Sequence, residues 1–431
     1  MNYEEARVYL DNAAKYGSVL GLDNMKEMLA RLDNPQDELK FIHISGTNGK
    51  GSVLAYLSTV LKEAGYRVGR YISPTLFRYR ERIQVNEAFI EKDSLAAHVA
   101  EIKAVADAME EEGLPHPTSF EIETALSFLY FKEKKCDIVV LETGLGGLDD
   151  ATNVITTTVM EVIASISMDH MGILGETIAE IAAKKAGIIK PDTLVVTMQQ
   201  KKEAMQVVLD TAKEKNCQVM IASPKSAKDI HYGYEEQSFS YGGYDNLKIS
   251  LAGSYQVANA VLAVEAVNGL IRLGYRITQE VLRSAFAHTR WPGRFTLIRR
   301  EPVFIIDGAH NRDAAQVLKE SIELYFPDKK IYYIMGVFRD KEYREILKTT
   351  APYAEAIITI ETPHNDRALP AQELAAAASE YHKHVKAADS IKDALKKSLS
   401  MAGKDDVIIA FGSLSFLGEI TREMGESEDL R

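Results

Sequence analysis

The sequence FIHIS-GTNGKGS, residues 41–52, joins a short apolar run to a loop that is rich in glycine. Apolar side chains resume at Val53 and recur with helical spacing as far as Leu61, and Gly65 ends the pattern. A buried strand, a tight turn and an amphipathic helix in this order predict the first element of a parallel sheet that helices cover.

The loop has the position that a phosphate-binding loop requires, between a strand and a helix. Glycines let backbone N–H groups approach phosphate oxygens, and the helix N-terminus adds a positive dipole. The alternative is an ordinary glycine-rich turn, but the dipole disfavours Lys50 at the helix entrance unless an anion shares the site. Lys50 would reach the terminal phosphates of a nucleotide and Ser52 would ligate Mg²⁺, although Gly51 separates them and the usual spacing is not met. The predicted nucleotide-binding loop is Gly46, Thr47, Asn48, Gly49, Lys50, Gly51 and Ser52.

Similar apolar runs alternate with helical patterns along the whole chain. The predicted strands of the first part lie at 41–44, 138–141, 162–166 and 194–196, and residues 223–250 have the composition of a small antiparallel flank. The motif Trp291-Pro292-Gly293-Arg294 interrupts the pattern, and strands resume at 304–306, 331–334, 357–360 and 407–410. We therefore expect an α/β protein with two domains: a P-loop-containing parallel-sheet domain over 1–293, and a smaller, Rossmann-like domain over 294–431.

The composition restricts the class of partner. With 431 residues and a formal net charge of −11, the chain is unsuited to binding nucleic acid or an anionic membrane as its main partner. It contains two cysteines, Cys136 and Cys217, too few for a disulfide scaffold. Neither a signal peptide nor an apolar run long enough for a membrane span is evident. We expect a cytoplasmic protein.

Three further residues in the first part are candidate metal-site residues. Glu142 follows the apolar run 138–141, at the sheet edge where open α/β folds bind ligands, so its carboxylate is suited to Mg²⁺. His170, in MDH, could complete a second metal site, or it could be an ordinary loop histidine. Lys185 falls in the middle of the apolar face of a helix that starts at the capping box Thr177–Glu180. Its amine could be carbamylated by CO₂, or the side chain could extend to solvent.

The second part opens on DGAHN, residues 307–311, directly after a predicted strand. Asp307 and His310 would then lie at the carboxyl end of that strand, where ligands bind. An ordinary Asx-rich turn is the alternative reading.

The motifs GTNGKGS, ETGLGG, DATN, MDH, KKAGIIK, WPGRF, DGAHN and FGSLSFLGE occur in an order that resembles the folylpolyglutamate synthase/dihydrofolate synthase family of Mur-type ligases. The segment SPTLFRYRERIQVN, residues 73–86, is similar to the folate-side loop of this family. The resemblance implies an ATP-dependent ligase that joins L-glutamate to a folate, or also to dihydropteroate, through an acyl phosphate. It implies ATP and two Mg²⁺ ions as cofactors, and we expect a monomer.

The resemblance also assigns residues. It implies that Glu142 and His170 bind metal, and that Lys185 takes the place of the family's carbamylated lysine. Asn259 would approach adenine, Arg294 phosphate, Asp307 the ribose and His310 the reacting groups. The residues implied near the folate or the incoming glutamate are Ser73, Pro74, Arg82, Asp150 and Ser413.

The chain departs from the family pattern at three positions. Thr75 and Tyr255 stand where the family usually has histidine, and Leu148 stands where it usually has arginine. Two other functions are alternatives to the folate ligase. A ligase acting on a UDP-linked peptide would need a further domain before Gly46, which we do not expect, and a P-loop ATPase without ligation would release phosphate without needing glutamate.

Overall fold

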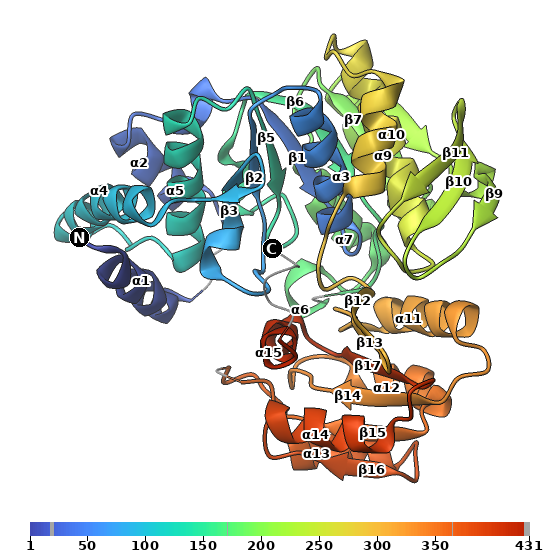
Figure 1. Ribbon diagram of the computed structural model, residues 1–431. Coiled ribbons are helices and arrows are strands. Elements are labelled where there is room, and N and C mark those ends of the chain that lie inside the picture. The colour runs from blue at the N-terminus through green and yellow to red at the C-terminus, as the bar shows by residue number, and fades with distance from the viewer. Residues whose placement is uncertain (18–20, 170, 364, 426–431) are drawn as a thin grey trace. The chain divides into compact units, whose positions relative to one another are not determined.

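The computed structural model describes residues 1–17, 21–169, 171–363 and 365–425 (Figure 1). The chain divides into two compact units, each built from separate stretches of sequence. The first unit comprises Met1–Thr75, Tyr79–Lys225 and Asn259–Ala285, and the second comprises Leu76–Arg78, Ser226–Ala258 and Phe286–Arg431. The domain boundary at residue 293 stays a prediction.

The first unit is organised around one mixed sheet. Its strands are β1 (Phe41–Ser45), β2 (Val68–Tyr71), β3 (Ile83–Val85), β4 (Ala88–Phe89), β5 (Ile138–Glu142), β6 (Thr158–Ile163), β7 (Leu194–Met198) and β8 (Gln218–Ala222). They follow the order β4-β3-β2-β5-β1-β6-β7-β8. The six strands from β2 to β8 in this order are parallel, and β3 and β4 add an antiparallel edge. Strand β1, which leads into the glycine-rich loop, is therefore central.

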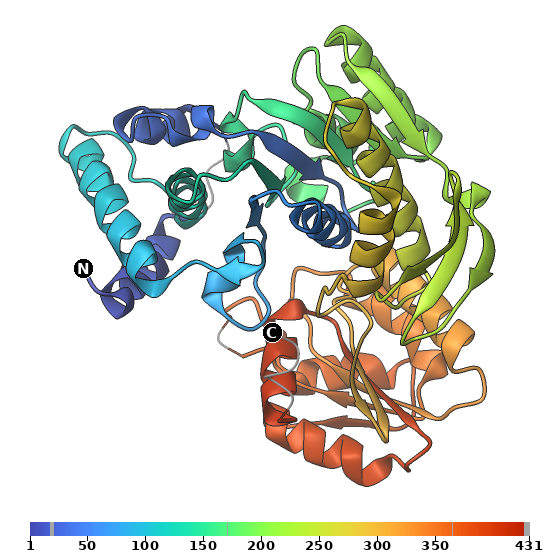
Figure 2. The ribbon, with the colours of Figure 1, turned by 45° about the horizontal axis from the view of Figure 1, so that its top comes forward.

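Helices cover both faces of this sheet. They are α1 (Tyr3–Asn12), α2 (Asp23–Arg31), α3 (Lys50–Glu63), α4 (Lys92–Glu111), α5 (Ser119–Glu133), α6 (Met171–Leu174), α7 (Ile178–Ala186), α8 (Lys202–Glu214), α9 (Gln256–Arg272) and α10 (Gln279–His288). The face of Phe41 and Leu141 packs on α1, α2, α4 and α5, and Ile163 packs with α7 and α8. On the opposite face, a Cβ on Gly269 of α9 would lie 2.8 Å from a side-chain carbon of Met160 and of Leu194. Helices α3 and α9 lie side by side in both views (Figure 1 and Figure 2).

The predicted strands of this unit are confirmed, with one shift. Strand β6 ends at Ile163, and Ile166 lies beyond it, because the chain turns there to bond the glycine-rich loop through the carbonyl of Ser165. Strand β2 was not predicted, since Gly69 and Arg70 interrupt its apolar pattern. The buried Arg70 is accommodated because its guanidinium donates to the hydroxyl oxygen of Ser58 at 2.9 Å.

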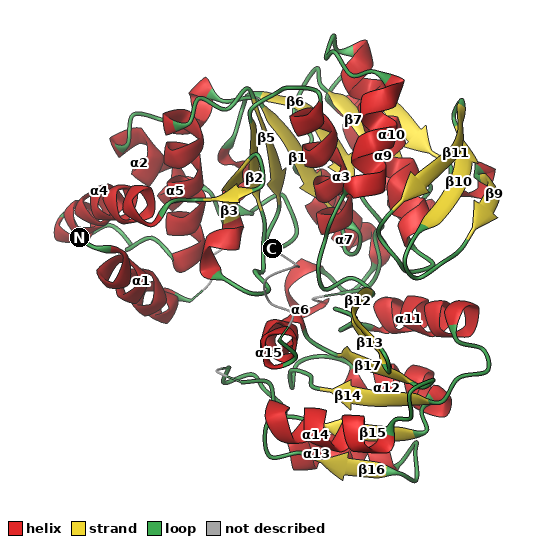
Figure 3. Ribbon diagram, in the orientation of Figure 1, coloured by secondary structure: helices red, strands yellow, loops and turns green. Residues whose placement is uncertain are grey.

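The second unit contains two sheets (Figure 3). Its strands are β9 (Lys228–His231), β10 (Gln237–Tyr241), β11 (Tyr244–Ile249), β12 (Thr296–Arg300), β13 (Val303–Ile306), β14 (Ile331–Met335), β15 (Ala356–Thr359), β16 (Val385–Ala387) and β17 (Val407–Phe411). Strands β9 to β11 form the predicted antiparallel flank, but they belong to this second unit, whereas the sequence predicted the flank within the domain over 1–293. The other six follow the order β12-β13-β17-β14-β15-β16 and are parallel except for β12.

Helices cover both faces of the six-stranded sheet, as a doubly wound fold requires. They are α11 (Arg312–Tyr325), α12 (Tyr343–Thr350), α13 (Ala371–Ser379), α14 (Ile391–Met401) and α15 (Leu417–Glu423). Helices α11, α12 and α13 share one apolar core with the sheet, and α14 and α15 share another. The α/β fold class predicted from the sequence is confirmed. Within the described part of the chain, no helix is both long enough and apolar enough to cross a bilayer.

Candidate active site

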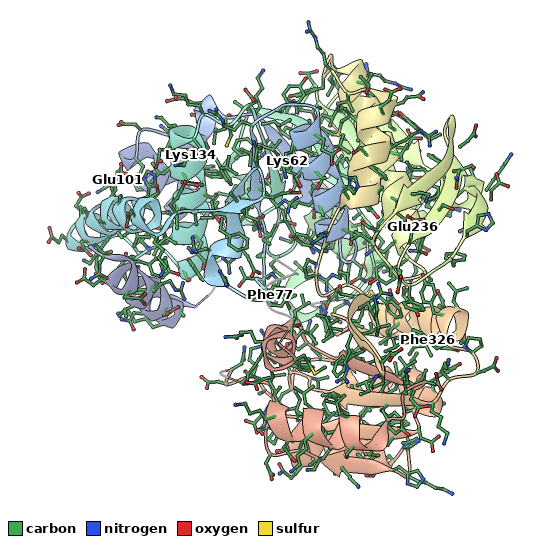
Figure 4. All side chains as sticks on the ribbon, viewed as in Figure 1. Lys62, Phe77, Glu101, Lys134, Glu236 and Phe326 are labelled. Atoms are coloured by element: carbon green, nitrogen blue, oxygen red, sulfur yellow. The ribbon has the colours of Figure 1, made fainter. Side chains whose placement is uncertain are left out.

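Helix α3 begins without the side-chain cap that many helices have. The residue before it, Gly49, has φ of +91°, and no side chain of the described residues caps the first turn, which also lacks an acidic residue. The first N–H groups of a helix have no partner within the helix, so an uncapped start is suited to an anion. Figure 4 labels Lys62, which lies in the last turn of α3, at the end opposite the loop.

The loop before α3 is fixed to the end of β6. The N–H of Thr47 donates to the Ser165 carbonyl at 2.7 Å, and the N–H of Ser167 donates to Thr47 Oγ1 at 3.0 Å. Glycine is required at two positions, because a Cβ on Gly46 would lie 2.8 Å from Ala164 Cβ and one on Gly49 would lie 2.5 Å from Asn259 Oδ1. Ser165 and Ser167, which bond Thr47 of the loop, were not predicted from the sequence. Their available signal was a pair of polar residues shortly after a strand.

Two lysines converge on one carbonyl of this loop. Lys50 Nζ donates to Gly46 O at 3.1 Å, and Lys185 Nζ donates to the same oxygen at 2.9 Å. Lys185 is 4% exposed, so the alternative of a side chain that extends to solvent is wrong. Burial, and secondarily the charge of Lys50, lowers the pKa of Lys185 to about 7. The neighbouring Lys184 instead bonds Asp149 at 2.6 Å near the surface.

Of the proposed metal ligands Glu142 and His170, the structure describes Glu142. Glu142 is the last residue of β5, is 5% exposed and is in register with Ile44 of β1. Its carboxylate therefore lies at the same sheet edge as the loop. His170 lies outside the described residues.

The residues predicted near a folate occupy two places in the first unit. Ser73 and Pro74 follow β2; Ser73 is partly exposed and Pro74 is exposed. Arg82 ends a short helix, η3 (Tyr79–Arg82), and its guanidinium lies 3.2 Å from the buried carboxylate of Glu123 in α5. Burial raises the pKa of Glu123, whereas the charge of Arg82 acts against that rise. Asp150 is also buried and precedes a second short helix, η4 (Ala151–Val154).

The second unit places Asp307 in a buried polar cluster. Its carboxylate accepts the N–H of Phe295 at 2.7 Å, the N–H of Ala309 at 2.8 Å and the Tyr255 hydroxyl at 3.1 Å. Burial raises the pKa of Asp307, and the charge of Arg294 opposes that rise. Tyr255, one of the three departures, thus supports Asp307 directly, a role that the sequence did not reveal.

Arg294, His310 and Ser413 lie in the same unit. A Cβ on Gly308 would lie 1.9 Å from Nη1 of Arg294, so glycine makes room for the guanidinium. The ring of His310 bonds the Gly308 carbonyl through Nδ1 at 2.7 Å. Ser413 accepts the N–H of Ser415 at 3.3 Å and starts the short helix η7 (Leu414–Phe416). The structure thus groups the phosphate loop with Asn259 and Lys185 in one unit, and Arg294 with Asp307 and His310 in the other.

Comparisons with known proteins identify the family. Residues 44–267 match the family model of the Mur ligase middle domain, and residues 293–414 match that of the Mur ligase glutamate ligase domain. The chain is 35% identical to the dihydrofolate synthase/folylpolyglutamate synthase of Bacillus subtilis (strain 168), over 98% of this chain and 99% of that protein.

Solved structures give the same result. A folylpolyglutamate synthase of Mycobacterium tuberculosis, complexed with ADP, superposes with a TM-score of 0.89 at 28% identity, over 98% of each chain. A folylpolyglutamate synthase of Thermotoga maritima superposes with a TM-score of 0.85 at 31% identity, over 100% of this chain and 98% of that one. The chain therefore belongs to the folylpolyglutamate synthase/dihydrofolate synthase family of ATP-dependent, Mur-type ligases.

Proposed function

We propose that this protein adds L-glutamate to a folate in an ATP-dependent reaction, as a tetrahydrofolylpolyglutamate synthase, with dihydropteroate as a second acceptor to be tested. The observation that carries the proposal is the uncapped start of α3, where Lys50 and the buried Lys185 meet at the Gly46 carbonyl. The names of the relatives, which include both synthase activities, supply the substrate class.

The reaction has two steps. A carboxylate oxygen of the folate attacks the γ-phosphorus of ATP, and the bond from phosphorus to the β,γ-bridging oxygen breaks, which gives an acyl phosphate and ADP. The amine nitrogen of glutamate then attacks the carbonyl carbon, the bond to the phosphate oxygen breaks, and the amine loses a proton. The first step gathers negative charge on the transferred group, and a positioned cation stabilises it.

Lys50 and the start of α3, which no side chain of the described residues caps, are suited to that task. Lys50 needs only to leave the carbonyls of Gly46 and Thr47, which it contacts at 3.1 and 3.4 Å, to reach a phosphate oxygen. Asn259, held against Gly49, would contact the adenine side of the nucleotide. Arg294 and Asp307 of the second unit would contact the phosphates and the ribose.

The donor set in the first unit fits magnesium. Ser52, 2% exposed at the start of α3, and Glu142, 5% exposed at the end of β5, offer a hydroxyl and a carboxylate, and oxygen ligands of this kind suit Mg²⁺. His170 is the proposed third protein ligand. A bound Mg²⁺ would neutralise charge on the phosphates.

Lys185 is suited to carrying a carbamate. Its pKa of about 7 leaves a substantial neutral fraction, and only a neutral amine attacks CO₂. The nitrogen of the neutral amine would bond the carbon of CO₂ and lose one proton, which leaves an anionic carbamate in place of a neutral amine. The nearby Lys50 would then lie close to an opposite charge.

The remaining substrate contacts stay predictions. Ser73, Pro74, Arg82 and Asp150 are proposed on the folate side, and Ser413 near the incoming glutamate. A monomeric state and a cytoplasmic location are proposed with them.

The test is an assay of ADP release with ATP and glutamate, which compares dihydropteroate with tetrahydrofolate as acceptor. We expect release that depends on both glutamate and tetrahydrofolate. Release without glutamate would favour a P-loop ATPase, and release only with a UDP-linked peptide would favour a cell-wall type ligase.

A further inference from the structure

Two side chains on one face of β1 reach the segment that runs from the end of β5 into η4. Successive residues of a strand point to opposite faces, so His43 and Ser45 point the same way. Ser45 Oγ donates to the Gly146 carbonyl at 2.7 Å, and His43 Nε2 lies 2.9 Å from Thr152 Oγ1. The strand that delivers the phosphate loop therefore also contacts both the loop over residues 143–150 and the start of η4.

The direction of the hydrogen bonds follows from hydrogen count. Thr152 has one hydroxyl hydrogen, and its oxygen lies 2.5 Å from Asp150 Oδ1, a length typical of a hydroxyl that donates to a carboxylate. The N–H of His43 Nε2 must then donate to Thr152 Oγ1. Consistently, Nδ1 of His43 has no hydrogen-bond partner among the described residues, as an unprotonated nitrogen can have.

His43 is kept neutral by its surroundings. It is 0% exposed, and burial, assisted by the charge of Lys190, lowers its pKa to about 3. A neutral ring has one N–H, so the tautomer is fixed by the bond to Thr152.

Asp150 connects Thr152 to the backbone of the loop. Its Oδ2 accepts the N–H of Leu145 at 2.7 Å, and its Oδ1 accepts the N–H of Thr152 at 3.0 Å. The Asp150 carboxylate therefore links Leu145, near the start of the loop, to Thr152, just after its end. The same loop starts at Glu142, the proposed metal ligand.

The far side of the loop rests on the last turn of α7. The N–H of Leu148 donates to the Lys184 carbonyl at 2.7 Å. A Cβ on Gly147 would lie 2.8 Å from that carbonyl oxygen and 2.9 Å from the carbonyl oxygen of Lys185. The loop therefore lies against the backbone of the lysine whose side chain reaches Gly46.

We propose that His43 is a positioning residue, which acts through Thr152 and Asp150 to fix the loop that lies between Glu142 and the end of α7. The role deepens the proposed function, on which its effect on turnover rests. Residues that orient metal ligands or reacting groups in this way commonly change activity by about 10- to 100-fold when they are replaced.

The test compares variants that remove the N–H or the hydroxyl with variants that keep it. His43→Leu and Thr152→Val should each lower kcat for glutamate-dependent ADP release by about 10-fold or more. His43→Gln and Thr152→Ser, which keep a donor and a hydroxyl, should recover most of it. KM for ATP should change by less than about 3-fold in all four, because the phosphate loop itself is intact.

Thr350→Val is the matched control. Thr350 is also 0% exposed, but its hydroxyl donates only within α12, to the Ile346 carbonyl at 2.9 Å. It should lower the urea midpoint of unfolding without lowering kcat. If His43→Leu does not fold, the Thr152 pair decides the question by itself.

A second readout does not depend on turnover. Hydrogen exchange of a peptide covering residues 143–150 should be faster in His43→Leu and Thr152→Val than in the wild type, and close to wild type in the two conservative variants. The double variant His43→Leu/Thr152→Val should be no worse in kcat than the worse single variant, because both break one chain of bonds.

The outcomes separate the two proposals. Wild-type protein without glutamate-dependent ADP release would refute the proposed function, while the exchange pattern would still judge His43. Unchanged exchange in His43→Leu and Thr152→Val, or losses in kcat that multiply in the double variant, would refute the role of His43.

Discussion

Helices α3 and α7 lie in the same unit and begin in opposite ways. Helix α7 starts with a complete capping box, in which Thr177 Oγ1 accepts the N–H of Glu180 at 3.2 Å and Glu180 Oε2 accepts the N–H of Thr177 at 2.9 Å. Helix α3 starts at Gly49 with no cap of this kind from the described residues, and a lysine follows at once. A helix that must hold its own position satisfies its first N–H groups, whereas one that receives an anion leaves them available.

The largest effect is expected where the uncapped start meets the nucleotide. Lys50→Ala and Ser52→Ala should each lower kcat for ADP release by about 100- to 1000-fold, because the charge on the transferred phosphoryl group loses its stabilising partner. Circular dichroism should show an unchanged fold. Lys62→Ala, at the other end of α3, is the matched control and should leave kcat near wild type; near-normal turnover in Lys50→Ala would remove the phosphate-loop assignment.

The next effect concerns the C-terminal turn of the capped helix. Lys185→Ala should be nearly inactive, with a loss of about 100-fold, because the proposed carbamate and its charge are gone. Millimolar acetate or formate should restore part of the activity. Lys184→Ala, which removes the adjacent, partly exposed amine that bonds Asp149, is the control, and acetate should not affect it. A crystal grown with bicarbonate and Mg²⁺ that shows a bare ammonium group at Lys185 would contradict the carbamate.

The pH dependence of this group can be measured without an assay. With a pKa of about 7, the neutral fraction of the Lys185 amine rises about 10-fold between about pH 6 and about pH 8. A carbamate carbon signal in ¹³C NMR, recorded with labelled bicarbonate, should grow over that range and be absent in Lys185→Ala. Because the folded pKa lies below the ordinary value of 10.5, the unfolded chain binds more protons in the window between them, and this group makes stability rise with pH there.

The glycine at the start of α3 should have a moderate effect. Gly49→Ala should raise KM for ATP by about 10-fold or more, because a Cβ would lie 2.5 Å from Asn259 Oδ1 at a φ of +91°. Gly65→Ala is the control, since Gly65 has a φ of +92° but no atom within 4 Å of the added Cβ. It should lower stability and leave KM unchanged. Equal KM values for the two variants would show that the contact with Asn259 is unimportant.

The smallest effect is expected at the capped start. Thr177→Ala should lower the free energy of unfolding by about 1 kcal/mol, as the loss of a helix cap commonly does. Urea denaturation would measure it, with Thr177→Ser as the variant that keeps the cap. A kcat reduced as strongly as in Lys50→Ala would mean that the two helix starts do not differ in the way described.

Most of the fold could be predicted from the sequence because apolar runs and helix signals are local. Strands β1, β5 and β7, the capping box at Thr177, and the antiparallel flank follow from residues that are adjacent or a few positions apart. Strand β2 could not be found in this way, because the partner that makes Arg70 acceptable, Ser58, lies on a helix.

The motifs of the proposed site could be found in the sequence, but the contacts that their residues make could not. The position of Lys185 on a helix face left open whether the amine is buried or extends to solvent, and only the structure shows that it is buried with the carbonyl of Gly46, far away in sequence, as its partner. The residues that hold the motif residues in place could not be predicted for the same reason. His43 bonds Thr152, and Tyr255 bonds Asp307, and no local pattern connects the members of either pair.

The non-contiguous first unit has a consequence for synthesis on the ribosome. Helix α9 covers Met160 and Leu194 and places Asn259 against Gly49, yet it follows the whole of β9 to β11 in the chain. Until residue 272 has left the exit tunnel, the nascent chain presents that apolar face of β6 and β7 without its cover. Partly covered sheets of this kind associate with other chains or with holdase chaperones, so ribosome-bound chains stalled before α9 should recruit chaperones more strongly than chains stalled after it.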